Sequence, residues 1–191
     1  MSGEAVGLYG GSFDPPHRGH VELARRAKEE LGLDSLHVLV SADPGHKHVV
    51  TPADVRLRLA RAAFPDDEVS LDDHPRTIDL LRAHPDWTDP FLVIGADQFR
   101  DFLTWKEPAE VLRRVRLAVA TRPGFPRAEL EPVLARLEQP ERVTFFEIEP
   151  IPVASHALRE RLAQGEEIGP EVPPAVAELI RSEGLYFPID D

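Results

Sequence analysis

Short apolar runs rich in β-branched residues alternate along this chain with segments in which apolar residues recur at helical spacing. A short continuous apolar run is typical of a buried strand, and recurrence every three to four residues is typical of an amphipathic helix. The alternation indicates β-α-β units, which build a parallel sheet with helices on both faces. Strands are predicted over residues 5–9, 36–40, 69–71, 91–95, 117–121 and 143–148, and helices over 18–31, 52–63, 78–83, 109–114, 127–137, 155–163 and 174–183.

Glycine and proline mark several helix ends in this pattern. Gly32 follows the first predicted helix, Pro174 opens the last one and Gly184 closes it, which are favoured positions for these residues. A chain of 191 residues is long enough for one α/β domain with a sizeable core and short for two. We therefore expect a single domain over residues 1–191, a Rossmann-like, doubly wound parallel sheet that binds its ligand at the carboxyl ends of the strands.

Composition narrows the class of protein. A formal net charge of −12 argues against nucleic acids and anionic membranes as partners, because both are bound through an excess of Lys and Arg. The absence of cysteine excludes disulfides, thiolate metal sites and cysteine catalysis. The sequence has no apolar run of membrane-spanning length, and its start, Met-Ser-Gly-Glu, lacks the basic flank of a signal peptide. We expect a cytoplasmic enzyme; a homo-oligomer is left open.

The segment Gly-Gly-Ser-Phe-Asp-Pro-Pro-His-Arg-Gly-His, residues 10–20, carries the clearest chemistry. It lies between the first predicted strand and the first predicted helix, where nucleotide-binding sheets hold phosphate. We expect Gly10 and Gly11 to let the backbone turn tightly and approach a ligand, and the free N–H groups of the helix start to face an anion. His17 and His20 lie three residues apart, so both rings can face one point. This combination predicts a polyphosphate site.

Two other interpretations of this segment stay open from the residues alone. The segment can be a glycine-rich loop beside a capped helix, with two histidines on the surface. His17 and His20 also have a spacing that zinc ligands use, with Asp14 as a third candidate nearby, although the chain has no cysteine to complete such a site.

The segment resembles the His-x-Gly-His signature of nucleotidylyltransferases, which join a nucleotide monophosphate to ATP, and most closely that of bacterial nicotinate mononucleotide adenylyltransferases. The resemblance runs from Val6 to Tyr186, nearly the whole chain. It implies a nucleotidylyltransferase-type fold and catalytic roles for His17, His20 and Arg159. It also implies ATP contacts from Gly10, Gly11, Ser12, Phe13, His17, His20, Gly95, Asp97, Ser155 and Arg159.

Further residues match the family's elements for the mononucleotide. Lys47 ends a Pro-x-His-Lys element, Trp105 follows Gly-Ala-Asp97, and Arg122 opens an Arg-Pro-Gly element. The resemblance implies that Lys47, Thr77, Trp105 and Arg122 bind the mononucleotide, with Trp105 stacked on its pyridine ring. From the residues alone, the three elements also have ordinary interpretations: a solvated lysine, a core tryptophan and a salt-bridged arginine.

The chain departs from the family's pattern at two places. In the last motif Ser155 and Arg159 match, but Ala154 and His156 replace two hydroxyl residues. We expect Ser155 to be the N-cap of its helix, with the helix start facing the phosphates and Arg159 one turn further on the same face. Near the third predicted helix, Arg76 stands in place of a tyrosine, in a segment that helps to recognise the pyridine nucleotide in the family.

The resemblance implies transfer of the adenylyl group of ATP to nicotinate mononucleotide, which gives deamido-NAD and pyrophosphate. His17 and His20 would hold the triphosphate and Arg159 the leaving pyrophosphate. Mg²⁺ would enter bound to ATP, held by phosphate oxygens and water, so we expect no dedicated metal site in the protein. The alternatives are nicotinamide mononucleotide or phosphopantetheine as the acceptor, and a relative that binds nucleotides without turnover.

Overall fold

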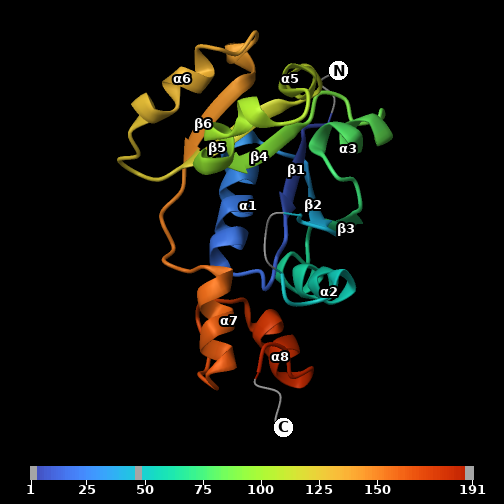
Figure 1. The fold of residues 1–191 in the computed structure, drawn as a ribbon, viewed down its shortest axis with the longest axis vertical. Coiled ribbons are helices and arrows are strands. Elements are labelled where there is room, and N and C mark those ends of the chain that lie inside the picture. The colour runs from blue at the N-terminus through green and yellow to red at the C-terminus, as the bar shows by residue number, and fades with distance from the viewer. Residues whose placement is uncertain (1–3, 46–48, 188–191) are drawn as a thin grey trace. The chain divides into compact units, whose positions relative to one another are not determined.

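Six strands form one sheet in the order β3-β2-β1-β4-β5-β6 in the computed structural model, which describes residues 4–45 and 49–187 (Figure 1). The strands are β1 (Val6–Gly11), β2 (Ser35–Ser41), β3 (Glu68–Asp72), β4 (Phe91–Gly95), β5 (Arg116–Thr121) and β6 (Val143–Glu147). β1 pairs with β4, β4 with β5 and β5 with β6 in parallel, with Leu8 opposite Leu92 and Val93 opposite Ala118. The predicted parallel α/β sheet is confirmed.

Helices connect the strands. They are α1 (Arg18–Leu31), α2 (Ala53–Ala63), α3 (Thr77–Ala83), α4 (Ala96–Arg100), α5 (Pro108–Arg114), α6 (Glu131–Leu134), α7 (Ser155–Ala163) and α8 (Pro174–Ser182), with 3₁₀ turns η1 (Phe102–Thr104), η2 (Arg127–Glu129) and η3 (Pro140–Arg142). The prediction of one helix over residues 127–137 is wrong. Pro132 has no N–H and fits only the first turn of a helix, so the segment splits into η2 and the short α6.

The contacts divide the chain into two compact units. Unit 1 comprises Met1–Gly10, Leu23–His37 and His74–Pro150. Its core is formed by the side chains of β1, β4 and β5 and of the helical segments beside them. These include Leu8, Leu92, Val93, Ile94, Phe99, Phe102, Val111, Leu117 and Val119, all at most 6% exposed. The near-continuous apolar runs of β4 and β5 are typical of parallel strands that are covered on both faces.

Unit 2 comprises Gly11–Glu22, Val38–Asp73 and Ile151–Asp191. Its α2 packs against α8, and Nη2 of Arg58 on α2 lies 2.7 Å from Oε2 of Glu183 just after α8. The core of this unit contains Phe13, Val40, Leu59, Phe64, Leu158, Leu162, Val176 and Ile180. The expectation of a single domain over residues 1–191 stays a prediction.

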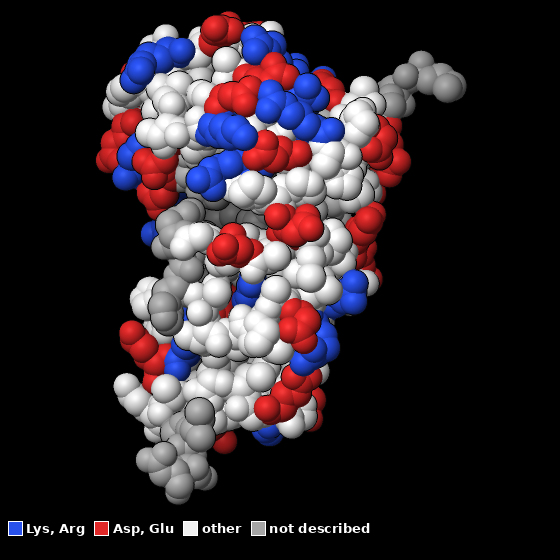
Figure 2. Space-filling view, turned by 45° about the vertical axis from the view of Figure 1, so that its right-hand side comes forward, with Lys and Arg blue, Asp and Glu red and all other residues white. Residues whose placement is uncertain are grey.

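Charged side chains of both signs are interspersed on the surface. Figure 2 shows Lys and Arg next to Asp and Glu on the face in view. Many of these side chains are ion-paired within one helix, as Arg114 with Glu110 on α5 and Arg26 with Glu30 on α1. Exposed pairs of this kind contribute little to stability, so the free energy of folding comes mainly from the apolar cores.

None of the helices over residues 4–45 and 49–187 is both long enough and apolar enough to cross a membrane.

Gly7 is a position in β1 where a side chain would clash with packed leucines. A Cβ there would lie 2.6 Å from Cδ1 of Leu33 and 2.7 Å from Cδ1 of Leu36. We expect Gly7→Ala to lower the free energy of unfolding by about 1–3 kcal/mol, because the packed leucines must move. Gly169→Ala is the control, since a Cβ at Gly169 has no atom within 4 Å. Urea titrations of both variants check this; equal stabilities would contradict it.

Candidate active site

The loop between β1 and α1 brings two histidines of unit 2 together. His17 ends the loop and His20 lies in the first turn of α1. Their rings are stacked, with centroids 3.7 Å apart and planes 27° apart. The backbone N–H of His17 donates to Nδ1 of His20 at 3.1 Å. Because Nδ1 of His20 accepts this bond, the ring proton of neutral His20 is on Nε2, where it can be donated.

His17 is buried and lacks a partner for one ring nitrogen. The side chain is 8% exposed, and its Nδ1 has no hydrogen-bond partner among the residues that the structure describes. Burial lowers the pKa of His17 to about 4, so the ring is neutral at neutral pH. A buried polar atom without a partner costs free energy, and a ligand that bonds to it removes this cost.

The glycines of the motif make room for aromatic rings. A Cβ on Gly19 would lie 3.0 Å from Cε1 of His17, and one on Gly11 would lie 2.7 Å from Cζ of Phe13. Gly10 is exposed and has open space where a side chain would be. Gly10 thus leaves the backbone accessible, whereas Gly11 and Gly19 allow the rings of Phe13 and His17 to pack on the chain.

The tight turn predicted at Gly10 and Gly11 is wrong. β1 continues through Gly11, and the residue with a left-handed backbone is Phe13, with φ of 50°. The ring of Phe13 is 1% exposed and lies edge-on to His20 and Phe64, with centroids 5.2 and 5.6 Å apart. Burial of this ring offsets the unfavourable backbone conformation, so the turn does not need a glycine.

Helix α7 contacts the same loop through both residues predicted on it. Oγ of Ser155 donates to the carbonyl of Pro15 at 2.9 Å, and Nη1 of Arg159 donates to the carbonyl of Asp14 at 2.7 Å. The predicted N-cap role of Ser155 is wrong. Ala154, with an extended backbone, is the N-cap, and Ser155 is the first helical residue. The hydroxyl of Ser155 donates to the loop and not to the helix backbone, and this bond fixes the start of α7.

Arg56 on α2 is a residue of this region that the sequence analysis missed. It is 1% exposed and donates to four backbone carbonyls: those of Ser12, Ser41, Ala42 and Thr51, at 2.6–3.2 Å. Burial lowers the pKa of Arg56, and the charge of Asp14 counters this effect. The sequence does contain a sign of this role, because Arg56 falls on the apolar face of α2 with Leu59, Ala60 and Ala63.

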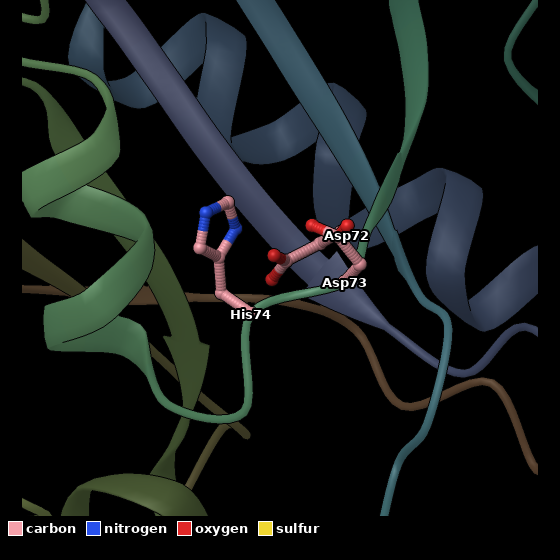
Figure 3. A group of neighbouring side chains, drawn as sticks. All are labelled: Asp72, Asp73 and His74. Carbon is pink, nitrogen blue, oxygen red and sulfur yellow. The ribbon is translucent and has the colours of Figure 1, made fainter.

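The arrangement does not support a zinc site at the histidines. The Asp14 carboxylate accepts hydrogen bonds from the backbone N–H of Val50 and the hydroxyls of Thr51 and Tyr186, so it is already used. Within the described part of the chain, the group with three ligand atoms close together is Asp72-Asp73-His74 at the end of β3, where these atoms lie within 4.8 Å of one another (Figure 3). This cluster contains neither His17 nor His20.

Unit 1 holds the predicted residues at the end of β4. Gly95 is the N-cap of α4, and its N–H donates to Oε1 of Gln98 at 3.2 Å. The side chain of Asp97 is 87% exposed and lies 2.9 Å from Nη2 of Arg100. A carboxylate that is so exposed is available to a ribose hydroxyl or to a hydrated cation.

The segments that carry Thr77 and Trp105 are tied together in unit 1. Nζ of Lys106 lies 2.9 Å from Oδ1 of Asp79, and Nη2 of Arg82 lies 2.6 Å from Oε2 of Glu107. The flanking residues of Trp105 are therefore paired with α3, which Thr77 begins.

Trp105 and Arg122, also predicted for the mononucleotide, have different surroundings. The indole of Trp105 is half-buried and tilted by 59° against Phe102, with ring centroids 5.3 Å apart. Arg122 is exposed in the turn after β5. Lys47 lies outside the described residues.

The lowered pKa of His17 makes stability depend on pH. Below pH about 6.5 the unfolded chain binds a proton at this ring, whereas the folded protein does so only near pH 4. The stability that neutral, buried His17 contributes is therefore fully present above pH about 6.5. Below this pH the free energy of unfolding falls by about 1.4 kcal/mol per pH unit. We expect His17→Gln to shrink the stability difference between pH 7 and pH 5 by about 2 kcal/mol.

Urea unfolding at both pH values measures this difference. His156→Gln is the matched control, since His156 is exposed on α7 and its loss should leave the difference as in the wild type. An unchanged pH dependence in His17→Gln would contradict the assignment.

Comparisons with known proteins agree on the family. The cytidylyltransferase-like family model matches residues 8–161. Probable nicotinate-nucleotide adenylyltransferases from Rubrobacter xylanophilus and Thermus thermophilus are 34% and 35% identical, with 95% of this chain and 91% and 98% of theirs aligned. The structure of Plasmodium falciparum nicotinic acid mononucleotide adenylyltransferase complexed with NaAD shares the fold, with a TM-score of 0.73 at 19% identity over 96% of this chain and 97% of that one. The chain belongs to the cytidylyltransferase-like family.

Proposed function

We propose that the protein transfers the adenylyl group of ATP to nicotinate mononucleotide, with deamido-NAD and pyrophosphate as products. The observation that carries this proposal is the cluster in unit 2, where Ser155 and Arg159 of α7 are hydrogen-bonded to the loop that leads to the stacked His17 and His20. These side chains offer N–H donors and one permanent positive charge, which suits a polyphosphate. The relatives named above are adenylyltransferases of this kind. We place the reaction in the cytoplasm.

The reaction requires the protein mainly to position the two substrates and to stabilise the charge that develops on the phosphates. The 5′-phosphate of the mononucleotide attacks the α-phosphorus of ATP in line, and the bond from that phosphorus to the bridging oxygen of pyrophosphate breaks. Phosphate is already a nucleophile, so no covalent intermediate is needed. His17, which is neutral, and His20 donate hydrogen bonds to the phosphates, and Arg159 holds the leaving pyrophosphate. Donors fixed before the reaction stabilise the charge that develops in the transition state.

A divalent cation, Mg²⁺ in our proposal, enters as part of the substrate MgATP. The carboxylate within the loop, Asp14, is 1% exposed and already accepts three hydrogen bonds. The residues beside the histidines therefore suit a cation that phosphate oxygens and water carry, since Mg²⁺ keeps much of its hydration shell in such sites.

Three residues of unit 1 would supply contacts to the mononucleotide, together with Lys47, which lies outside the described residues. Trp105 presents a flat apolar ring that can stack on pyridine, Arg122 is an exposed cation for the 5′-phosphate, and Thr77 and Lys47 complete the set implied by the family resemblance. A pantetheine arm offers no aromatic ring to stack on, so Trp105 favours a pyridine nucleotide over phosphopantetheine.

Pyrophosphate release from MgATP tests the proposal directly. Nicotinate mononucleotide, nicotinamide mononucleotide and phosphopantetheine are supplied separately to the purified protein. We expect the highest kcat/KM with nicotinate mononucleotide. Preference for another acceptor would correct the substrate, and binding of MgATP without release of pyrophosphate with any acceptor would show a non-catalytic nucleotide binder.

His20→Ala should lower kcat by about 10²–10³, because one donor to the developing charge is lost. The matched control is His84→Ala, which removes an imidazole of unit 1 that is stacked on Trp87 at 4.1 Å and should leave kcat within about twofold. Steady-state kinetics measure both variants, and their melting temperatures report the fold. Wild-type turnover in His20→Ala would remove this residue from the mechanism.

Trp105→Ala should weaken binding of the mononucleotide about tenfold, since an aromatic stacking partner contributes roughly 1–3 kcal/mol. The affinity for MgATP should change less than twofold. Calorimetric titration with each nucleotide separates the two effects. Equal losses for both nucleotides, or a collapse of the melting temperature, would identify Trp105 as a core residue.

A further inference from the structure

A buried carboxylate lies within the loop that carries the two histidines. Asp14 is 1% exposed. Its Oδ2 accepts the backbone N–H of Val50 at 2.7 Å, and its Oδ1 accepts the hydroxyl of Thr51 and, at 2.7 Å, that of Tyr186. A buried charge needs such donors, because it has lost its water. All four residues belong to unit 2.

Tyr186 reaches Asp14 from the other end of the chain, 172 residues away. After α8 the backbone turns at Gly184, with φ of 63°, and the N–H of Leu185 returns to the carbonyl of Ile180 at 2.9 Å. Tyr186 itself has φ of 66°, which is unfavourable for a residue with a side chain. Such a conformation persists only where other contacts fix it, and the hydroxyl bond to Asp14 is one of these contacts.

The hydroxyl of Tyr186 stays protonated, and so remains a donor, at neutral pH. Burial and the nearby charge of Asp14 both raise the pKa of Tyr186 above its ordinary value. The bond to Asp14 is thus between a neutral phenol and a carboxylate, which is among the stronger hydrogen bonds in proteins.

Asp14 in turn determines where Arg159 lies. Nη1 of Arg159 donates to the backbone carbonyl of Asp14 at 2.7 Å and lies 4.0 Å from its Oδ2. The side chain of Arg159 is 16% exposed, so it has little freedom to adopt another position. The backbone of the same loop is held at Ser12, whose carbonyl accepts from Nη1 of Arg56 at 2.9 Å.

We propose that Tyr186 is a positioning residue for the triphosphate site, which acts through Asp14 to fix Arg159 and the loop of His17. The inference rests on the function proposed above for this cluster. It gives the C-terminal turn a role in ATP binding, although Tyr186 does not itself touch the nucleotide.

The variant that tests this role is Tyr186→Phe, which removes the hydroxyl and keeps the ring. We expect kcat/KM for MgATP to fall about tenfold, because a hydrogen bond to a charged group is lost, while KM for the mononucleotide stays within twofold. Ser182→Ala is the matched control. It removes a hydroxyl that donates to the carbonyl of Leu179 at 3.3 Å within α8, and its kinetics should equal those of the wild type.

A double-mutant cycle with Arg159→Lys separates positioning from general stability. If Tyr186 acts through Arg159, Tyr186→Phe should have little further effect on kcat/KM in the Arg159→Lys background. A lower melting temperature with unchanged kcat and KM, or fully additive effects in the cycle, would overturn the proposal.

Direct titration of the wild type and Tyr186→Phe with MgATP keeps this test independent of turnover. A tenfold weaker Kd in Tyr186→Phe supports the positioning role even if no acceptor supports pyrophosphate release, a result that would overturn the proposed function alone. Equal Kd values for the two proteins would overturn the positioning role alone, and no MgATP binding by the wild type would overturn both.

Discussion

Two opposite charges buried in unit 2, the guanidinium of Arg56 and the carboxylate of Asp14, constrain the loop on which the proposed chemistry depends. Each is 1% exposed, and each is bonded to groups from distant parts of the sequence. Arg56 donates hydrogen bonds to backbone carbonyls at the ends of β1 and β2 and in the segment before α2. Asp14 accepts hydrogen bonds from two hydroxyls and one backbone N–H. Removal of either charged side chain would leave its own hydrogen-bond partners buried without that partner.

The two units differ in how they hold their candidate residues. In unit 2 Ser155 and Arg159 are fixed by part-buried hydrogen bonds to the carbonyls of Pro15 and Asp14. In unit 1 the segments of Thr77 and Trp105 are joined by exposed ion pairs, such as that of Lys106 with Asp79. Exposed pairs are weak and are screened by salt. The nucleotide that carries the reacting phosphates would thus meet preformed donors, and its acceptor a more adaptable surface.

The sequence predicts elements well where one local pattern dominates. The strand over residues 91–95 matches β4 to the residue, because a covered parallel strand is a continuous apolar run. The helix over residues 127–137 fails at Pro132, where the apolar spacing continues but the backbone cannot. Helix α4 has five residues, too few for a period to be visible in the sequence.

The candidate site likewise combines local features that the sequence predicts with long-range contacts that it does not predict. The spacing of His17 and His20 is local, and the structure brings the two rings together. The partners of Asp14 are 36 to 172 residues away from it, and hydrogen bonds over such separations leave no periodic trace in a single sequence. The N-cap predicted at Ser155 was misplaced by one residue, because a hydroxyl at a helix start can bond either to the helix backbone or to a neighbouring loop.

The packing of His17 on Gly19 explains which positions of the His-x-Gly-His signature tolerate substitution. Arg18 is exposed, and its backbone N–H donates to the carbonyl of Glu171 at 2.8 Å. Gly19 provides the space beside the imidazole of His17. In a mutational scan, position 18 should therefore tolerate most side chains, whereas position 19 should behave like a catalytic position although it carries no functional group.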